Sequence, residues 1–202
     1  MVKLIPTKEE WYSALSERHG EKIQNIFESA TVAICGLGGL GSNIAFALAR
    51  AGIGKLILID FDSVDITNLH RQQYKANQIG ICKTQALKEN LLEIAPYVTI
   101  ETHSVRISED NAEEILEKAD IICEAFDDAE CKAMLVNLVN ERMSGKYLVA
   151  ASGMAGFGSA NAIRTRRLSK RIYICGDGTS DVQSYGSLVA SRVMLCAAHQ
   201  AH

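Results

Sequence analysis

Three glycines in the segment 31–62 have the spacing of a phosphate-binding turn. Gly36, Gly38 and Gly41 follow a short apolar run, and a second apolar run ends at Asp60. Glycines at this spacing let the backbone turn tightly and approach phosphate oxygens, while the helix that follows directs free N–H groups toward them. A carboxylate at the tip of the second strand can bind ribose hydroxyls. The segment predicts binding of a dinucleotide or a nucleoside triphosphate.

Two cations and two amides further along favour the triphosphate. Asn68, Arg71 and Gln72 stand in the segment NLHRQ, and Lys83 stands in GICK. Their positive charge and hydrogen-bond donors exceed what the diphosphate of a nicotinamide cofactor needs. We therefore expect ATP, and an NAD-dependent oxidoreductase is the alternative if that expectation fails.

Asp127 is the expected ligand of a magnesium ion. It follows the apolar run ADIICEAF, which predicts a buried strand. Ligands of parallel α/β sheets bind at the carboxyl ends of the strands. Mg²⁺ takes one or two carboxylates and completes its coordination with phosphate oxygens and water.

Apolar runs and helix patterns alternate between residues 31 and 152, and this alternation predicts the fold. We expect an α/β architecture with a doubly wound, mostly parallel Rossmann-like sheet. Before the first strand, Thr7 begins a capping-box pattern that predicts one N-terminal helix. Trp11, Ile23 and Phe27 are among its apolar positions.

The boundaries of the later elements are also predicted. Ser108 is the expected N-cap of a helix, and a long polar segment after the second strand is typical of a functional loop. From Ser152 the chain is rich in glycine and small polar residues. We expect a hairpin-like extension of the sheet there, with strands over 160–164 and 171–175, and a last helix over 184–199.

Length and composition indicate one domain over residues 1–202. The chain is 48% hydrophobic and 22% charged, which suits one compact core. A net charge of −3 argues against nucleic acid or an anionic membrane as partner. The sequence shows neither a signal-peptide core nor a run of ~18 apolar residues, so we expect a cytoplasmic protein.

The ordered motifs GLGGLGS, LIDFDSVDITNLHRQ, GICK and EAFDD resemble the ThiF/MoeB family of the ubiquitin-activating-enzyme-like superfamily. Among its members the chain most resembles the short ThiF-type proteins of thiamine biosynthesis. The resemblance implies adenylation of the C-terminal glycine carboxylate of a small ubiquitin-fold sulfur carrier, ThiS in the thiamine case. It further implies MgATP as co-substrate, release of pyrophosphate, and a homodimer.

The resemblance also assigns site residues. It implies phosphate contacts at Gly38, Gly39 and Gly41, a ribose contact at Asp60, and triphosphate contacts at Asn68, Arg71, Gln72 and Lys83. Gly36 of the glycine turn and Asp62 complete the expected nucleotide-binding set. Arg71 and Lys83 are the expected catalytic cations, and Asp127 is the expected catalytic metal ligand. No general base is expected, because a carboxylate nucleophile is already ionised at neutral pH. Asp62 has no separate role that we assign beyond capping its loop.

The resemblance also draws attention to one N-terminal arginine and to the cysteines. Arginines near the N-terminus of relatives can reach the ATP of a partner subunit, which makes Arg18 a candidate.

Longer relatives carry two C-x-x-C pairs for zinc and a cysteine that forms a persulfide or thioester. Here Cys175 stands alone where the first pair would fall, so no zinc is expected. If a thiol reacts, Cys175 and Cys131 are the candidates, and packing in the core is the alternative.

Other interpretations remain open. The chain could activate a different carboxylate, as the tRNA threonylcarbamoyladenosine dehydratases of the same superfamily do. It could also bind nucleotide as a subunit without turnover. A basic run between Arg164 and Arg171 could meet an acidic carrier or form a solvated loop.

Overall fold

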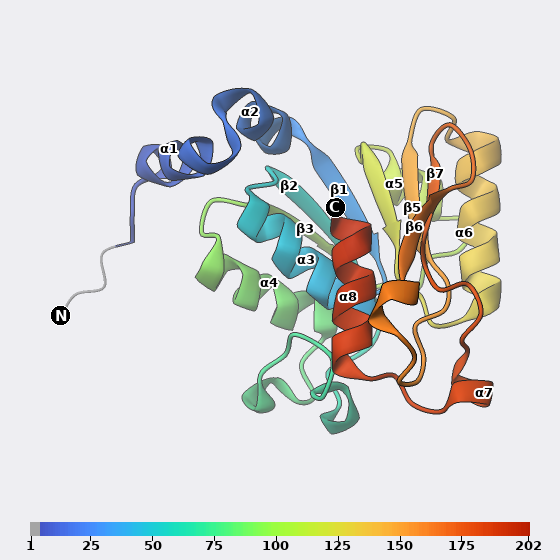
Figure 1. Cartoon of the computed structure of the whole chain (residues 1–202). Coiled ribbons are helices and arrows are strands. Elements are labelled where there is room, and N and C mark those ends of the chain that lie inside the picture. The colour runs from blue at the N-terminus through green and yellow to red at the C-terminus, as the bar shows by residue number, and fades with distance from the viewer. Residues whose placement is uncertain (1–4) are drawn as a thin grey trace.

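The computed structural model describes residues 5–202, which form a seven-stranded sheet with helices on both faces (Figure 1). The strands are β1 Thr31–Cys35, β2 Lys55–Ile59, β3 Thr99–His103, β4 Ile121–Glu124, β5 Tyr147–Ala151, β6 Arg164–Arg167 and β7 Ile172–Gly176. Their order is β3-β2-β1-β4-β5-β7-β6. All neighbours pair in parallel except β6 and β7, which form an antiparallel hairpin. The predicted fold class is confirmed.

The helices lie in two layers around the sheet (Figure 1). The helices α3 Gly39–Ala51, α4 Lys83–Ile94 and α8 Ala190–Ala201 cover one face, and α5 Ala112–Leu116 and α6 Ala129–Arg142 cover the other. The remaining helical elements are α1 Lys8–His19, α2 Glu21–Ser29, α7 Val182–Tyr185 and the 3₁₀ turns η1 Ile66–Asn68, η2 Ala76–Gln78 and η3 Ala160–Ala162. No helix within residues 5–202 has the length and apolar content needed to cross a bilayer.

Strand β1 shows why the sheet is buried on both faces. Val32 and Ile34 point into the core beneath α3 and α8, while Ala33 and Cys35 point into the core beneath α5 and α6. Each is at most 2% exposed. A continuous apolar run of this kind is typical of a central parallel strand.

The N-terminal region differs from the single helix that the sequence predicts. Thr7 and Glu10 do form the capping box. Gly20, however, adopts a φ of +84° and separates α1 from α2, because only glycine takes this conformation at little cost. Trp11 and Phe27 pack against the core as expected, but Ile23 is 47% exposed.

Three later boundaries are corrected. Ser108 does not cap a helix; α5 has only five residues, its N-cap is Asn111, and the Ser108 carbonyl accepts N–H bonds in the preceding turn. The first hairpin strand begins at Arg164, because residues 160–162 form a 3₁₀ turn. The predicted last helix is divided by Gly186, whose φ of +83° ends α7, and α8 then begins at Ala190.

Candidate active site

A cleft of about 560 Å³ opens where β1, β2, β4 and β5 end. The sequence-predicted residues that line it are Gly36, Gly38, Gly39, Asp60, Asp62, Asn68, Arg71, Gln72, Lys83 and Asp127. The fold therefore brings together residues that are up to 91 positions apart in the sequence. Gly41, Arg18 and Cys175 are not among the lining residues.

The turn between β1 and α3 needs glycine, because other backbone atoms lie too close to leave room for a side chain. Gly36 has a φ of +94°, and a Cβ atom there would lie 2.7 Å from the Ala125 carbonyl oxygen. A Cβ atom on Gly41 would lie 1.8 Å from the Gly36 carbonyl oxygen. Gly41 therefore lets the first turn of α3 pack against the end of β1. It does not itself line the cleft.

Asp60 braces this turn from the end of β2. Its carboxylate accepts the Leu37 N–H at 2.6 Å and the Asp62 N–H at 2.8 Å. Burial raises the pKa of Asp60, and the Lys83 ammonium and these two N–H groups lower it part of the way back. A buried carboxylate at this edge is placed to accept hydroxyl groups of a ligand.

Lys83 and Asp62 form an ion pair at the cleft wall. Lys83 Nζ lies 2.7 Å from Asp62 Oδ2, and the lysine side chain is 7% exposed while the aspartate side chain is 48% exposed. The backbone adds a bond from the Lys83 N–H to the Asp62 carbonyl oxygen at 2.9 Å. Asp62 thus orients the predicted phosphate-binding lysine, a role that the sequence did not indicate.

The loop after β2 presents polar atoms that lack partners. Asn68 uses its side-chain oxygen to accept the Asp65 N–H at 3.0 Å, which caps η1. Arg71 donates from Nη1 to the Thr67 carbonyl oxygen at 3.2 Å. Among residues 5–202, the buried Arg71 Nε and Gln72 Oε1 have no hydrogen-bond partner. Buried polar atoms are normally paired, so these atoms mark a place for ligand or water.

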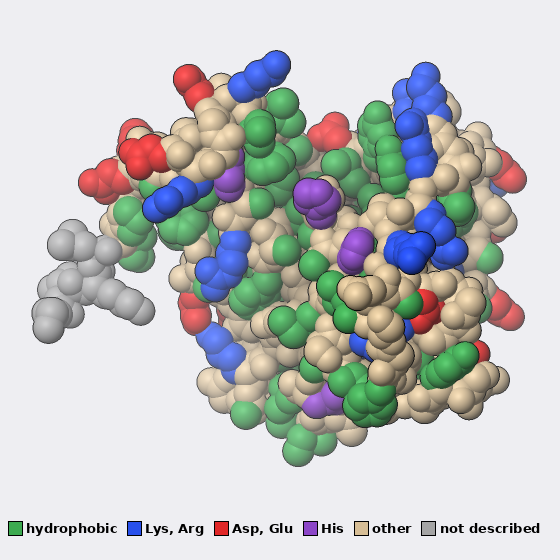
Figure 2. Space-filling view, in the orientation of Figure 1, with side chains coloured by type: hydrophobic (Ala, Val, Ile, Leu, Met, Phe, Trp, Pro, Cys, Tyr) green, Lys and Arg blue, Asp and Glu red, His purple; other side chains and the backbone are tan. Residues whose placement is uncertain are grey.

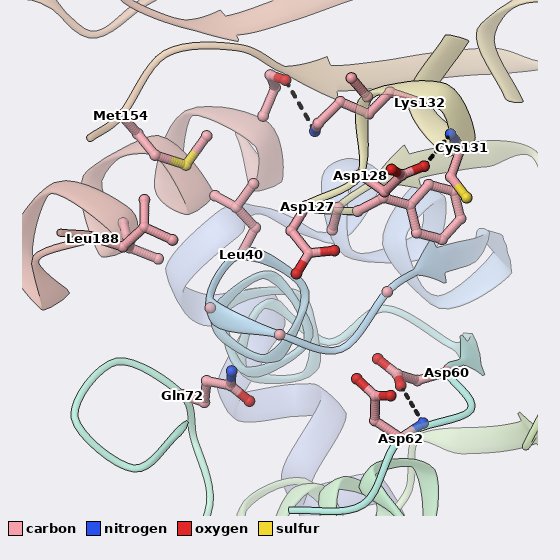
Figure 3. A pocket seen from close by; sticks show the side chains of 18 of the residues that line it. Leu40, Asp60, Asp62, Gln72, Asp127, Asp128, Cys131, Lys132, Met154 and Leu188 are labelled. Carbon is pink, nitrogen blue, oxygen red and sulfur yellow. Dashed lines mark hydrogen bonds between the residues drawn. The ribbon is translucent and has the colours of Figure 1, made fainter. Parts of the chain in front are cut away.

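Two neighbouring aspartates at the end of β4 have different orientations (Figure 3). Asp127 points into the cleft, toward the turn between β1 and α3. Asp128 instead accepts the Cys131 N–H at 2.7 Å and caps α6, and this bond lowers the pKa of Asp128. In the described part of the chain, no three His, Cys, Asp or Glu side chains cluster as a metal site. Within the described residues, Asp127 therefore faces the cleft without belonging to a three-ligand cluster.

Comparison with known sequences decides the family. The sequence model of the ThiF family matches residues 12–194. The chain belongs to the ThiF family. The expected ThiF/MoeB membership is confirmed.

Two curated relatives align with part of this ThiF-family chain. The adenylyltransferase and sulfurtransferase UBA4 of Lodderomyces elongisporus is 34% identical over 136 residues, which are 67% of this chain and 30% of UBA4. The ubiquitin-like modifier-activating enzyme 5 of Caenorhabditis elegans is 43% identical over 100 residues, which are 48% of this chain and 24% of that protein. The chain spans less than a third of the length of either relative.

Solved structures share the fold over a greater share of their length. The E. coli tRNA N6-threonylcarbamoyladenosine dehydratase TcdA in complex with AMP superposes with a TM-score of 0.85 at 22% identity, covering 98% of this chain and 94% of that chain. E. coli MccB in complex with MccA-N7isoASN superposes with a TM-score of 0.67 at 23% identity, covering 89% of this chain and 56% of that chain. At these identities the likeness shows the fold alone.

Lys132, which lines the cleft, belongs to an ion pair that the sequence analysis missed. Glu124, the last residue of β4, is fully buried and accepts Lys132 Nζ at 2.9 and 3.1 Å. Lys132 also donates to the Ala151 carbonyl oxygen at 3.2 Å. Burial raises the pKa of Glu124, and Lys132 lowers it part of the way back. These bonds join β4, β5 and α6. The signal available in the sequence was a glutamate at the end of an apolar strand.

A third ion pair holds the segment 153–159, whose first three residues form another wall of the cleft. Arg192 on α8 pairs with Asp177, and it donates to the Ser159 carbonyl oxygen at 2.9 Å and to the Met154 carbonyl oxygen at 3.4 Å. Burial raises the pKa of Asp177, but hydrogen bonds from Ser180 and its neighbour outweigh it and hold the pKa at about 2. Nothing in the local sequence indicates this long-range pair.

The remaining candidates lie apart from the cleft or have other surroundings. Cys175 is fully buried in β7, and burial raises the pKa of its thiol. Cys131 is half-buried, lines the cleft, and lies 3.5 Å from Arg106 Nη2. Arg18 is exposed in the last turn of α1, next to α2, which leads into the amino end of β1 (Figure 1). The cleft is at the carboxyl end of that strand.

Proposed function

We propose that this ThiF-family chain is an adenylyltransferase. It activates the C-terminal glycine carboxylate of a ThiS-like sulfur carrier with MgATP in thiamine biosynthesis and releases pyrophosphate. The observation that carries the proposal is one cleft edge that combines a glycine turn, a buried aspartate, two cations and an inward-pointing aspartate. The name of the relative UBA4, an adenylyltransferase and sulfurtransferase, supports the same class of reaction.

The residues fit a triphosphate. The turn at Gly36 brings backbone to the cleft at the start of α3, where free N–H groups favour phosphate. Lys83 and Arg71 supply positive charge, and the unpaired Arg71 Nε supplies a donor. Asp60 is placed to accept ribose hydroxyls.

The residues also fit a magnesium ion that is held mainly by phosphate. Asp127 offers one carboxylate that faces the cleft, and such an ion needs only one or two. When bound, Mg²⁺ would neutralise phosphate charge. A metal cage made only of protein side chains is not required for such an ion.

The reaction needs positioning and charge stabilisation more than proton transfer. A carboxylate oxygen of the carrier attacks the α-phosphorus, a new P–O bond forms, and the bond to pyrophosphate breaks. Negative charge grows on the leaving pyrophosphate, where Arg71 and Lys83 stabilise it. No proton moves, because the carboxylate arrives ionised.

Carrier-dependent ATP–pyrophosphate exchange tests the proposal. We expect exchange with a ThiS protein that ends in Gly-Gly and a loss of about a hundredfold or more in Lys83→Met, because that variant lacks a preorganised charge at the developing anion. Lys75→Met is the matched control, since Lys75 forms an exposed pair with Glu93 outside the cleft. Absence of carrier-dependent exchange, or equal rates in the two variants, would contradict the proposal.

A second candidate is activation of a carboxylate borne on tRNA. The superposition with TcdA over nearly the full length of both chains favours it. In that case tRNA, and not the carrier, would bind and would stimulate ATP cleavage. Parallel assays with tRNA and with carrier distinguish the two substrates.

The homodimer and Arg18 belong to the first proposal. In a dimer whose partner supplies Arg18, the Arg18→Ala and Lys83→Met proteins would each be inactive alone, and mixing them would restore exchange in mixed dimers. Sedimentation would give the oligomeric state. A monomer with full exchange would remove this part of the proposal.

A further inference from the structure

Five cations gather on the β6–β7 hairpin, and we call them the basic hairpin. They are Arg164, Arg166, Arg167, Lys170 and Arg171. The first four are exposed and Arg171 is half-buried. None of them takes part in an ion pair found among residues 5–202. Figure 2 shows Lys and Arg side chains gathered in blue on the side that carries β6 and β7.

The charge of the basic hairpin is opposite to that of the rest of the protein. The whole chain has 21 Lys and Arg and 24 Asp and Glu. Without these five cations, 16 basic residues face 24 acidic ones, a net charge of −8. A concentrated positive patch on such a chain directs an acidic partner to one place.

Protection of a sheet edge accounts for only part of this charge. β6 is an edge strand, and charged side chains on an edge discourage pairing with other chains. Lys170 and Arg171, however, lie beyond β6. The guanidinium of Arg167 lies 5.7 Å from the ring centre of Tyr173, and that of Arg171 lies 6.0 Å from the ring of Tyr147. Ordered Arg and Tyr side chains of this kind are enriched at protein interfaces.

The basic hairpin is continuous with the cleft wall. A Cβ atom on Gly178 would lie 2.4 Å from Arg166 Nη2, and Gly178 stands two residues before Ser180, which lines the cleft. Beyond it lies an apolar rim, formed by Phe157, Val182 and Tyr185, which are 84%, 53% and 56% exposed.

The apolar rim is held in place by the two segments that carry it. The Gly156 N–H donates to the Ser187 carbonyl oxygen at 2.9 Å, which joins the segment 153–159 to the chain after α7. Arg192 fixes the same segment from below. The rim is therefore a preorganised surface.

We propose that the basic hairpin and the apolar rim together are the docking surface for the body of the carrier protein. The inference rests on the proposed function. The carrier presents an acidic patch to the hairpin and an apolar patch to the rim, and its C-terminal tail enters the cleft between them. RNA fits less well, because the rim beside the hairpin is apolar, and the cleft wall at Val182 also carries Asp181 and Asp128, which would repel phosphates.

Charge reversal on the hairpin tests this surface. In the double variant Arg164→Glu, Lys170→Glu we expect the carrier KM to rise about tenfold or more, because charges at an interface rim chiefly govern association. The effect lies in the carrier KM, since neither residue lines the nucleotide cleft, and the ATP KM stays within about twofold. Neither side chain makes a hydrogen bond or ion pair found in the described residues.

The matched control carries the same change of charge elsewhere. Lys22→Glu, Lys118→Glu alters two exposed lysines on α2 and after α5, outside the cleft and the hairpin. We expect its carrier KM to stay within about twofold of wild type. Raising the salt from 50 to 300 mM should weaken carrier binding in wild type and in the control, and much less in the hairpin variant.

Equilibrium binding of the carrier without ATP separates the two proposals. A wild type that binds carrier through the hairpin but gives no exchange fails only the proposed function. Equal carrier affinities in the hairpin and control variants overturn the docking surface, even where exchange is normal. Binding of tRNA that is lost in the hairpin variant, with carrier affinity unchanged, also overturns it.

Discussion

One wall of the cleft is the turn between β1 and α3, and another is the segment 153–159. The first is held by backbone geometry, since Gly36 and Gly41 allow contacts that no side chain would permit. The second is held by the side chains of Asp177 and Arg192, which come from β7's end and from α8. The comparison shows two ways to preorganise a site.

The two walls also differ in the state of their aspartates. Asp60 is buried beside the glycine turn and its pKa is raised. Asp177 is held by several donors and its pKa is about 2. Changes that remove glycine should affect the wall formed by the turn between β1 and α3. Changes that remove charge should affect the wall formed by the segment 153–159, which we call the far wall.

The largest expected effect on stability comes from breaking the far wall. Arg192→Met leaves Asp177, whose side chain is only 10% exposed, without its cation, and such a loss costs about 4 kcal/mol of unfolding free energy. Denaturant unfolding measures it. Arg142→Met is the control, because Arg142 pairs with Glu113 at the surface and should contribute less than about 1 kcal/mol. Equal losses of unfolding free energy in both variants would show that the Arg192 ion pair does not hold the far wall.

A glycine substitution should affect the other wall selectively. Gly36→Ala places a Cβ atom against Ala125 at a positive φ, which costs about 2 kcal/mol and weakens ATP binding. Gly145→Ala is the control, since nothing lies within 4 Å of its Cβ position. Calorimetry with ATP and denaturant unfolding report the two quantities. Unchanged ATP affinity in Gly36→Ala would show that the turn is not part of the nucleotide site.

Acidification should change the stabilisation from Asp177 and that from Asp60 in opposite directions. The folded pKa of Asp177 is depressed, so its stabilisation is present above the unfolded value and is lost as pH falls toward 2. The folded pKa of Asp60 is raised, so its protonation favours the folded state on acidification. Between about pH 5 and pH 3, the free energy of unfolding of Asp177→Asn should fall less steeply with decreasing pH than that of wild type. The free energy of unfolding of Asp60→Asn should fall more steeply. Parallel slopes would contradict both assignments.

The smallest expected effect is at Cys175. Its thiol is buried and its pKa is raised, so it is a poor nucleophile and packs in the core. Cys175→Ala should keep carrier-dependent exchange within about twofold and lose about 1 kcal/mol of stability. A complete loss of exchange in a folded variant would assign Cys175 a chemical role after all.

Much of the fold could be read from local patterns. The apolar runs around the glycine turn predicted β1, α3 and β2, because a central parallel strand is apolar on both faces and a phosphate turn needs glycine. The hairpin was predicted from a different signal, two short strand-like pieces in a segment rich in glycine and small polar residues, although its first strand begins at Arg164. The single N-terminal helix was wrong, since a positive φ at Gly20 is not visible in periodicity.

The site could be predicted only in part. Lys83, Arg71 and Asp127 were named from their order along the chain, and the fold places all three in one cleft. The sequence could not predict that Lys83 pairs with Asp62, or that Asp127 and not Asp128 points into the cleft. Both depend on side-chain direction in the folded protein.

By itself the sequence determined the order of strands and helices, the glycine turn and the types of residue offered to a ligand. These properties depend on neighbours along the chain, through backbone conformation and the burial of apolar runs. Only the tertiary structure decided that Glu124 pairs with Lys132, that Arg192 holds the far wall, and that the basic hairpin leads to the cleft. These contacts join residues from separate elements, and their geometry exists only once the sheet and its helices are packed.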